Sequence, residues 1–182
     1  MNALHIPTRL ALLLVVAFAI PFAQSPSHAA APQQAKDTIL KTTDISGRIF
    51  PTTVFLRGQT ATIEMDNAGG VRYADGPLVL AALVDSSGYA SQVREKYQAY
   101  LIAEVSIEIS GQTLKPGAYG FGFLDNNKFA VMDVGANDVL QATSKRDAEI
   151  RRPVPLQFVA SEEAGSYRLY HGRDYVVFHR VK

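Results

Sequence analysis

The stretch that most constrains the fold spans residues 105–133, because it holds the clearest alternation and the clearest turns in the chain. Residues 105–110 alternate apolar with polar side chains, the period of two that is typical of a half-buried strand. Gly111 and the run Lys115-Pro116-Gly117 predict a chain reversal, since Pro fixes φ and Gly adopts the positive φ that other residues resist. Asp125-Asn126-Asn127 predicts a second reversal. We therefore expect three strands here, joined by two tight connections.

The second of these expected strands alternates aromatic residues with glycines: Tyr119, Gly120, Phe121, Gly122 and Phe123. Glycines on one face of a strand allow a backbone, a ring or a ligand to approach closely. Two interpretations stay open. The glycines line a ligand groove, or the aromatic row belongs to the core and the glycines accommodate a bulky neighbour such as Tyr97 or Tyr100.

The N-terminus has the pattern of a secretory signal peptide. Arg9 supplies a short positive region, residues 10–20 are apolar without interruption, and small residues follow up to Ala29. The apolar run is well short of the roughly twenty residues that a membrane-spanning helix needs, although a retained membrane anchor is the alternative. We expect a signal peptide over residues 1–29, cleaved after Ala29 or at the neighbouring Ala30. The protein would then be periplasmic or extracellular, with no membrane span after cleavage.

Residues 30–182 have the length of one domain with a single core. Cleavage would remove Arg9 from the 18 basic residues and leave 17 against 17 acidic ones. This balance lacks the basic excess of nucleic-acid-binding proteins, so nucleic acid is not an expected partner. The chain has no cysteine, which excludes disulfides, thiol catalysis and thiolate metal sites. We expect residues 30–44 to form a flexible extension and residues 45–182 a single β-rich domain.

The segment before the organising stretch predicts a buried strand followed by a helix. Residues 78–84 are apolar throughout and lie between Pro77 and a turn sequence, as expected for a central strand covered on both faces. A short amphipathic helix over about residues 91–102, with Ser91 as its N-cap, is the expected cover for the second face.

Alternation and turn residues predict hairpins at both ends of the domain. Residues 53–65 alternate around a turn at Arg57-Gly58-Gln59, and residues 166–170 and 174–181 form the last expected pair of strands. Residues 66–70 hold two Asx residues and two glycines and are expected to be a loop. The fold class is therefore mainly β. We expect a single antiparallel β-sandwich or open barrel of about nine strands with one short helix.

The sequence VSIEISGQTLKPGAY over residues 105–119 resembles a hairpin of an uncharacterised family of secreted bacterial β-sandwich proteins, a domain of unknown function. That family shows the pattern V-x-I-x-G-x-x-L-P-A-G-x-Y, and here Pro116 comes one place later. Asp138-Val139-Leu140 and Arg152-Pro153-Val154 are also similar to the family, so the resemblance spans residues 105–154. It implies a β-sandwich in an exported protein. Because the family has no established activity, it implies no catalytic residues.

Candidate ligand-binding residues cluster around the expected C-terminal hairpin: Tyr170, His171, Arg173, Asp174 and Tyr175. These residue types are favoured in recognition. The alternative interpretation is that they are solvated turn residues beside two strand tyrosines.

His171 and His179 are the only histidines after residue 29, and they are the candidates for a metal ligand or a general base. In one extended strand they would lie roughly 26 Å apart and could not share a metal. Either histidine would need a carboxylate such as Asp133 or Asp138. The chain has no G-x-S-x-G elbow and no glycine-rich phosphate motif, so no catalytic residue and no cofactor is assigned.

The expected function is that of an exported, non-enzymatic β-sandwich that binds a ligand or partner at the cell envelope. Two alternatives stay open. One is a hydrolase or metal-assisted enzyme that uses a histidine with carboxylates, and the other is a purely structural envelope component. The identity of the ligand or partner and the oligomeric state are left open.

Overall fold

The computed structural model describes residues 36–45 and 49–181. The expected signal peptide and the cleavage positions Ala29 and Ala30 lie outside the described residues. The described part contains fourteen strands, one short 3-10 helix and one α-helix, and every strand pair is antiparallel. The expected mainly β fold is confirmed.

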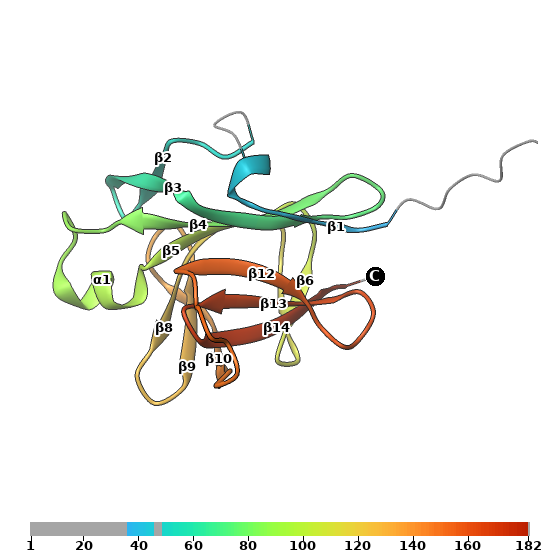
Figure 1. Cartoon of the computed structure of the whole chain (residues 1–182). Helices are drawn as coiled ribbons and strands as arrows, with labels where there is room; N and C mark the ends of the chain where they lie inside the picture. The colour runs from blue at the N-terminus through green and yellow to red at the C-terminus, as the bar shows by residue number, and fades with distance from the viewer. Residues whose placement is uncertain (1–35, 46–48, 182) are drawn as a thin grey trace, which may run out of the picture. The chain divides into compact units, whose positions relative to one another are not determined.

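The larger sheet has eight strands in the order β1-β3-β4-β5-β8-β9-β10, with β2 paired to β3 (Figure 1). Its strands are β1 (Thr38–Leu40), β2 (Thr53–Leu56), β3 (Gln59–Arg72), β4 (Leu78–Asp85), β5 (Ala99–Ala103), β8 (Gly117–Leu124), β9 (Lys128–Met132) and β10 (Asp138–Thr143).

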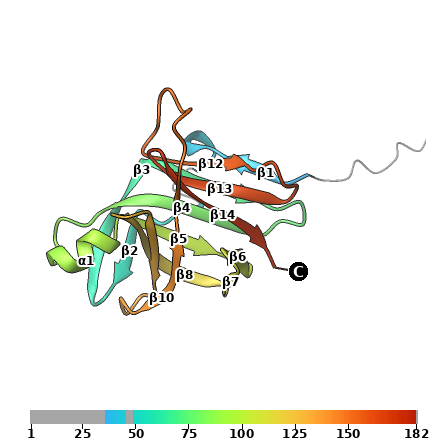
Figure 2. The same cartoon turned by 90° about the horizontal axis from the view of Figure 1, so that it is seen from below.

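The smaller sheet has six strands in the order β12-β13-β14-β6-β7, with β11 paired to β14. Its strands are β6 (Ile107–Ile109), β7 (Gln112–Leu114), β11 (Lys145–Arg146), β12 (Leu156–Ala160), β13 (Ser166–His171) and β14 (Asp174–Arg180). Figure 2 shows β12, β13 and β14 stacked beside β1, β3 and β4. The two sheets therefore form a sandwich.

The main core lies between the two sheets. Val79 of β4 and Phe121 of β8 contribute from the larger sheet, and Phe158 of β12 and Phe178 of β14 contribute from the smaller one. Apolar burial on this scale is the main favourable contribution to folding. The sheets thus share one apolar layer, as in other sandwiches.

A second core covers the other face of the larger sheet. It contains Leu80 and Ala82 of β4, together with Val93 of α1 (Ser91–Lys96) and residues around η1 (Thr42–Asp44). Since Val79 and Ala81 face the first core, β4 is buried on both sides and pairs with β3 and β5. The predicted central strand is confirmed.

The helix is shorter than predicted. It spans Ser91–Lys96, whereas we expected a helix over about 91–102, and Ala90 is its N-cap in place of Ser91. The following residues form β5 in the middle of the larger sheet, where Leu101 faces one core and Tyr100 the other. A short run that is apolar on both sides fits the period of a helix as well as that of a strand. Here the burial of both faces favours the strand.

The segment expected to be a loop at residues 66–70 is part of β3. A register shift between Glu64 and Ala68 accommodates the extra residues as a β-bulge. Gly70 serves close packing and not a turn, since a Cβ there would lie 2.6 Å from the Val79 carbonyl oxygen. Part of the expected flexible extension is also ordered, because Thr38–Leu40 pairs with β3 as β1. Short strands of this kind raise the count from about nine to fourteen.

The organising stretch forms four strands and not three. Ser110 and Gly111 both have positive φ, 51° and 78°, and close a two-residue hairpin between β6 and β7. The Lys115-Pro116 connection then takes the chain from the smaller sheet into β8 of the larger one. The hairpin predicted at Arg57-Gly58-Gln59 is confirmed between β2 and β3.

The glycines of β8 make room for protein side chains and backbone, as the packing interpretation expected. A Cβ at Gly120 would lie 2.8 Å from Tyr97 Cδ2, and one at Gly122 would lie 2.7 Å from the Lys96 carbonyl oxygen. Phe121 on the opposite face belongs to the main core. The proposed ligand groove along these glycines is therefore filled by Tyr97 and the end of α1.

Candidate ligand-binding site

The predicted cluster at the β13–β14 turn packs against the loop that precedes β12. Tyr170 Oη donates a hydrogen bond to Asp147 Oδ2 at 2.9 Å, and the Tyr170 ring lies 4.9 Å from the ring of Tyr175. Arg173 donates to the backbone carbonyls of Ala148 and Ile150. These contacts hold the loop in place, and a binding role for these residues stays a prediction.

The other two members of the predicted cluster also have partners within the chain. Asp174 forms an ion pair with Arg146 of β11 at 3.0 Å. The His171 ring stacks on Phe123 with centroids 5.9 Å apart, and burial lowers the pKa of His171 below its ordinary value. A histidine held neutral against an aromatic ring is consistent with packing.

The two histidines have different surroundings. His179 lies near the far end of β14, with Nε2 3.8 Å from Glu108 Oε1. The carboxylates considered as partners have other contacts: Asp133 accepts hydrogen bonds from Asn137, which lower its pKa, and Asp138 pairs with Lys96 at 2.7 Å. Within residues 36–45 and 49–181, no three His, Asp or Glu side chains are grouped to hold a metal ion.

A hollow of about 560 Å³ lies at the end of the sandwich where β14 finishes. Four segments that are far apart in the sequence line it: Asp37 before β1, residues 73–75 between β3 and β4, residues 163–166 before and at the start of β13, and residues 179–181. The hollow depends on how the two sheets pack, since β1 and β14 belong to different sheets.

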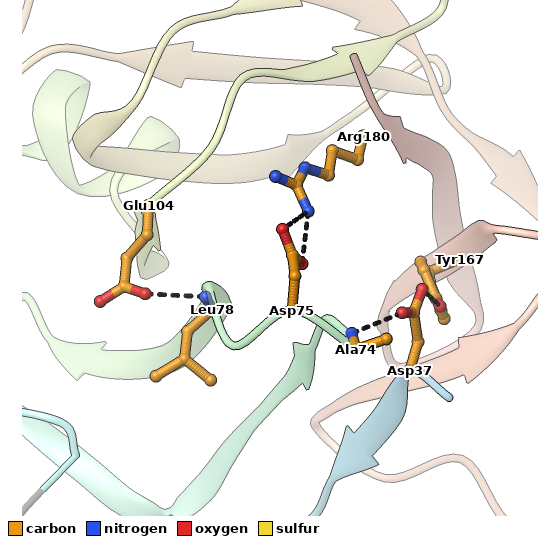
Figure 3. Close-up of polar contacts among 7 residues, drawn as sticks. All are labelled: Asp37, Ala74, Asp75, Leu78, Glu104, Tyr167 and Arg180. Atoms are coloured by element: carbon orange, nitrogen blue, oxygen red, sulfur yellow. Dashed lines mark hydrogen bonds and ion pairs between the residues drawn. The ribbon is translucent and has the colours of Figure 1, made fainter. Parts of the chain in front are cut away.

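Asp37 connects its own segment to the β3–β4 loop and to β13. Its Oδ2 accepts a hydrogen bond from Tyr167 Oη at 2.5 Å, and its Oδ1 accepts one from the Ala74 backbone N–H at 2.8 Å (Figure 3). Both donors are neutral groups. The carboxylate therefore ties the residue before β1 to β13 and to the β3–β4 loop. It forms no ion pair among the described residues, although, after the hydrogen bond to Asp75, its charge helps to raise the pKa of Arg180.

Arg180 reaches the same loop from β14. Its Nη1 lies 2.6 Å from Asp75 Oδ1 and 2.8 Å from Asp75 Oδ2, and Figure 3 shows the pair between the two segments. The guanidinium also lies over the ring of Tyr73, 5.2 Å from its centroid. The loop is fixed at its other end by Glu104, whose Oε2 accepts a hydrogen bond from the Leu78 N–H at 2.8 Å.

Tyr73 is the unusual residue of the hollow. It is only 4% exposed, and its hydroxyl is buried without a hydrogen-bond partner among the described residues. Burial, with the nearby charge of Asp37, raises the pKa of Tyr73 to about 12. An unsatisfied buried hydroxyl costs about 1–3 kcal/mol, so a ligand atom that reached it and formed a hydrogen bond would recover part of that cost.

Sequence reasoning placed Asp37 in an extension and did not single out Tyr73 or Arg180. Each is an ordinary residue in its local sequence, and only His179 of this hollow was a candidate. The one feature that could have pointed to the hollow is the C-terminal hairpin. Its pairing of β13 with β14 brings the strand of Tyr167 beside the strand of Arg180.

Comparisons of the chain with protein-family models, with curated proteins and with solved structures found no match. The resemblance over residues 105–154 to secreted β-sandwich proteins thus stays a prediction. In the part of the chain that the structure describes, no helix is both long enough and apolar enough to cross a membrane.

Proposed function

We propose that this chain is an exported, non-enzymatic β-sandwich that binds a small ligand in the hollow beside Asp37, Tyr73 and Arg180. The observation that carries the proposal is that Tyr73 lines a hollow of about 560 Å³ and that its buried hydroxyl has no hydrogen-bond partner among the described residues. Small-ligand sites combine apolar walls with a few convergent polar groups, and this hollow has both.

The proposed export depends on the signal-peptide pattern of residues 1–29. The resemblance to secreted β-sandwich proteins supports the same compartment. Mass spectrometry of the chain recovered from a bacterial periplasm is the direct test. A first residue at Ala30 or Ala31 supports export, and an unprocessed chain that stays in the cytoplasm contradicts it.

Ligand binding is tested by thermal unfolding of the purified chain against sugars, amines, cell-wall fragments, fatty acids and metal ions. A ligand present at one hundred times its Kd should stabilise the fold by about 2.7 kcal/mol, a shift of roughly 5–10 °C for a domain of this size. The shift should shrink in Asp37→Asn. It should persist in Asp125→Asn, a matched change at an exposed turn between β8 and β9. A shift that is equal in both variants would place the ligand elsewhere.

A further inference from the structure

The charges of the hollow are unbalanced. Among the described residues that line it, Asp37, Asp75 and Glu163 are acidic and Arg180 is basic, so their formal charges sum to −2 when His179 is neutral. Asp75 is already paired with Arg180. Asp37 and Glu163 form no ion pair within the described residues. An anionic ligand would therefore meet net repulsion.

The walls between these charges are apolar. Ala74, Ala164, Val181 and the ring of Tyr73 line the same hollow. Carbon atoms of a ligand would replace water at these surfaces, whereas a bare metal ion would gain nothing from them and needs more ligands than the site groups together. A carboxylate that is hydrogen-bonded but forms no ion pair among the described residues, next to apolar walls, suits an organic cation.

The Tyr73 hydroxyl supplies the second polar contact. It is neutral at physiological pH, and its oxygen can accept a hydrogen bond from an N–H donor. The Arg180 guanidinium over the Tyr73 ring shows that this place already accommodates a positive group. The Tyr73 hydroxyl is buried and Arg180 is held by Asp75, so binding at this position requires the 33% exposed Arg180 side chain to shift and admit the ligand.

We propose that the hollow binds an aliphatic ammonium group, with the Asp37 carboxylate as its counter-ion and the Tyr73 hydroxyl oxygen as a hydrogen-bond acceptor. This inference rests on the proposed function and names the chemistry of its ligand. The ammonium group can belong to a free amine or to a lysine-like side chain of a peptide, and both present the same charge on the same kind of carbon chain.

The test is titration calorimetry of the purified chain with three probes of five carbons each that carry different end groups: cadaverine, the diol with hydroxyls at both ends, and glutarate. Cadaverine alone should bind, and its affinity should fall as salt is added. A fourth probe, Nα-acetyl-lysine methylamide, presents one ammonium on a peptide-like body. Binding of this probe more tightly than cadaverine identifies a peptide source, and the reverse order identifies a free amine.

Two variants locate the binding. Asp37→Asn should weaken cadaverine about tenfold, which corresponds to about 1.4 kcal/mol, while the matched control Asp125→Asn should leave it unchanged. Tyr73→Phe removes a hydroxyl that has no partner in the described part of the chain, so it tests the contact without removing a hydrogen bond that the structure shows. It should weaken cadaverine about threefold to tenfold.

The outcomes separate the two proposals. Tighter binding of the diol or of glutarate, lost in Asp37→Asn, would overturn the ammonium inference and keep a ligand site in the hollow. Cadaverine binding that is equal in the wild type, in Asp37→Asn and in Tyr73→Phe would place the amine outside the hollow and overturn the inference as well. Absence of binding by all four probes and by the wider panel would overturn both.

Discussion

The ring of Tyr97 lies against Gly120 so closely that a Cβ at position 120 would come within 2.8 Å of Tyr97 Cδ2. Tyr97 follows the last residue of α1, and Gly120 is in the middle of β8. The contact therefore fixes the end of the helix against the outer face of the larger sheet.

Gly120→Ala should destabilise the fold by about 1–3 kcal/mol, because the added methyl group overpacks the space between Tyr97 and Leu56 Cδ1, which lies 3.0 Å from the same position. Chemical denaturation measures the change. Gly88→Ala is the matched control: a Cβ there meets nothing within 4 Å, and its φ is not positive. Equal free energies of unfolding for the two variants would show that Tyr97 and the end of α1 can move to accommodate the added methyl group at no cost.

Tyr97→Phe and Tyr89→Phe should differ in effect, although the two rings pack edge to face 5.2 Å apart. Tyr97 Oη is buried and has no partner within residues 36–45 and 49–181, so its removal should be neutral or stabilising. Tyr89 Oη lies 2.9 Å from the Gln59 carbonyl oxygen, and its loss should cost about 1 kcal/mol. The free energies of unfolding of the two variants test this prediction. A larger loss of stability in Tyr97→Phe than in Tyr89→Phe would mean that the Tyr97 hydroxyl does form a hydrogen bond in the folded protein.

Tyr167→Phe should destabilise the protein by about 1–2 kcal/mol, since it removes the hydrogen bond to the Asp37 carboxylate and keeps the ring that packs on Phe178. The effect should concentrate on β1. Hydrogen exchange at the β1 amides should therefore accelerate more than exchange at β9. Tyr119→Phe, which loses only a bond to the Lys115 carbonyl, is the comparison, and uniform acceleration in the Tyr167 variant would argue against a local tie.

Stability should fall at alkaline pH. Burial raises the pKa of Tyr73 to about 12 from its ordinary value of 10, and burial raises the pKa of Tyr97 and of Tyr167 as well. A raised pKa in the folded state means that the unfolded chain loses the proton first. The contribution of these groups is therefore complete below pH 10 and is lost between pH 10 and the folded-state value.

Unfolding measured at several pH values checks this prediction. The free energy of unfolding should change little from neutral pH up to the ordinary tyrosine pKa and then decrease. Tyr73→Phe should reduce the slope of the decrease, because one of the shifted groups is gone. A slope that is unchanged in Tyr73→Phe would mean that Tyr73 ionises as readily in the folded protein as in the unfolded chain.

The fold class was predictable because it depends on local patterns. Alternation and turn residues identify strands such as β4, and positive-φ positions such as Arg57 and Gly58 close the hairpin that the sequence suggested. The helix length was not predictable, since the residues after Lys96 fit both a helical and a strand period. Only pairing with β4 and β8 makes them β5.

The candidate site was not predictable for a different reason. Asp37 and Tyr167 are 130 residues apart, and Asp75 and Arg180 are 105 apart. No local pattern connects such residues. By contrast, the C-terminal cluster around His171 was visible because its members are neighbours in the sequence, and the structure accounts for them by contacts with the residues 146–150 and with Phe123.

The hollow joins the first described strand to the last one, and this sets an order of events for a chain that emerges with its N-terminus first. Asp37 and Tyr73 are made early, but Tyr167 and Arg180 arrive only with the final hairpin. Contacts of such long separation form late in folding. A ligand of this hollow would therefore bind only chains that have folded through the final hairpin. A chain truncated before β13 would not be stabilised by the ligand and would remain open to proteolysis.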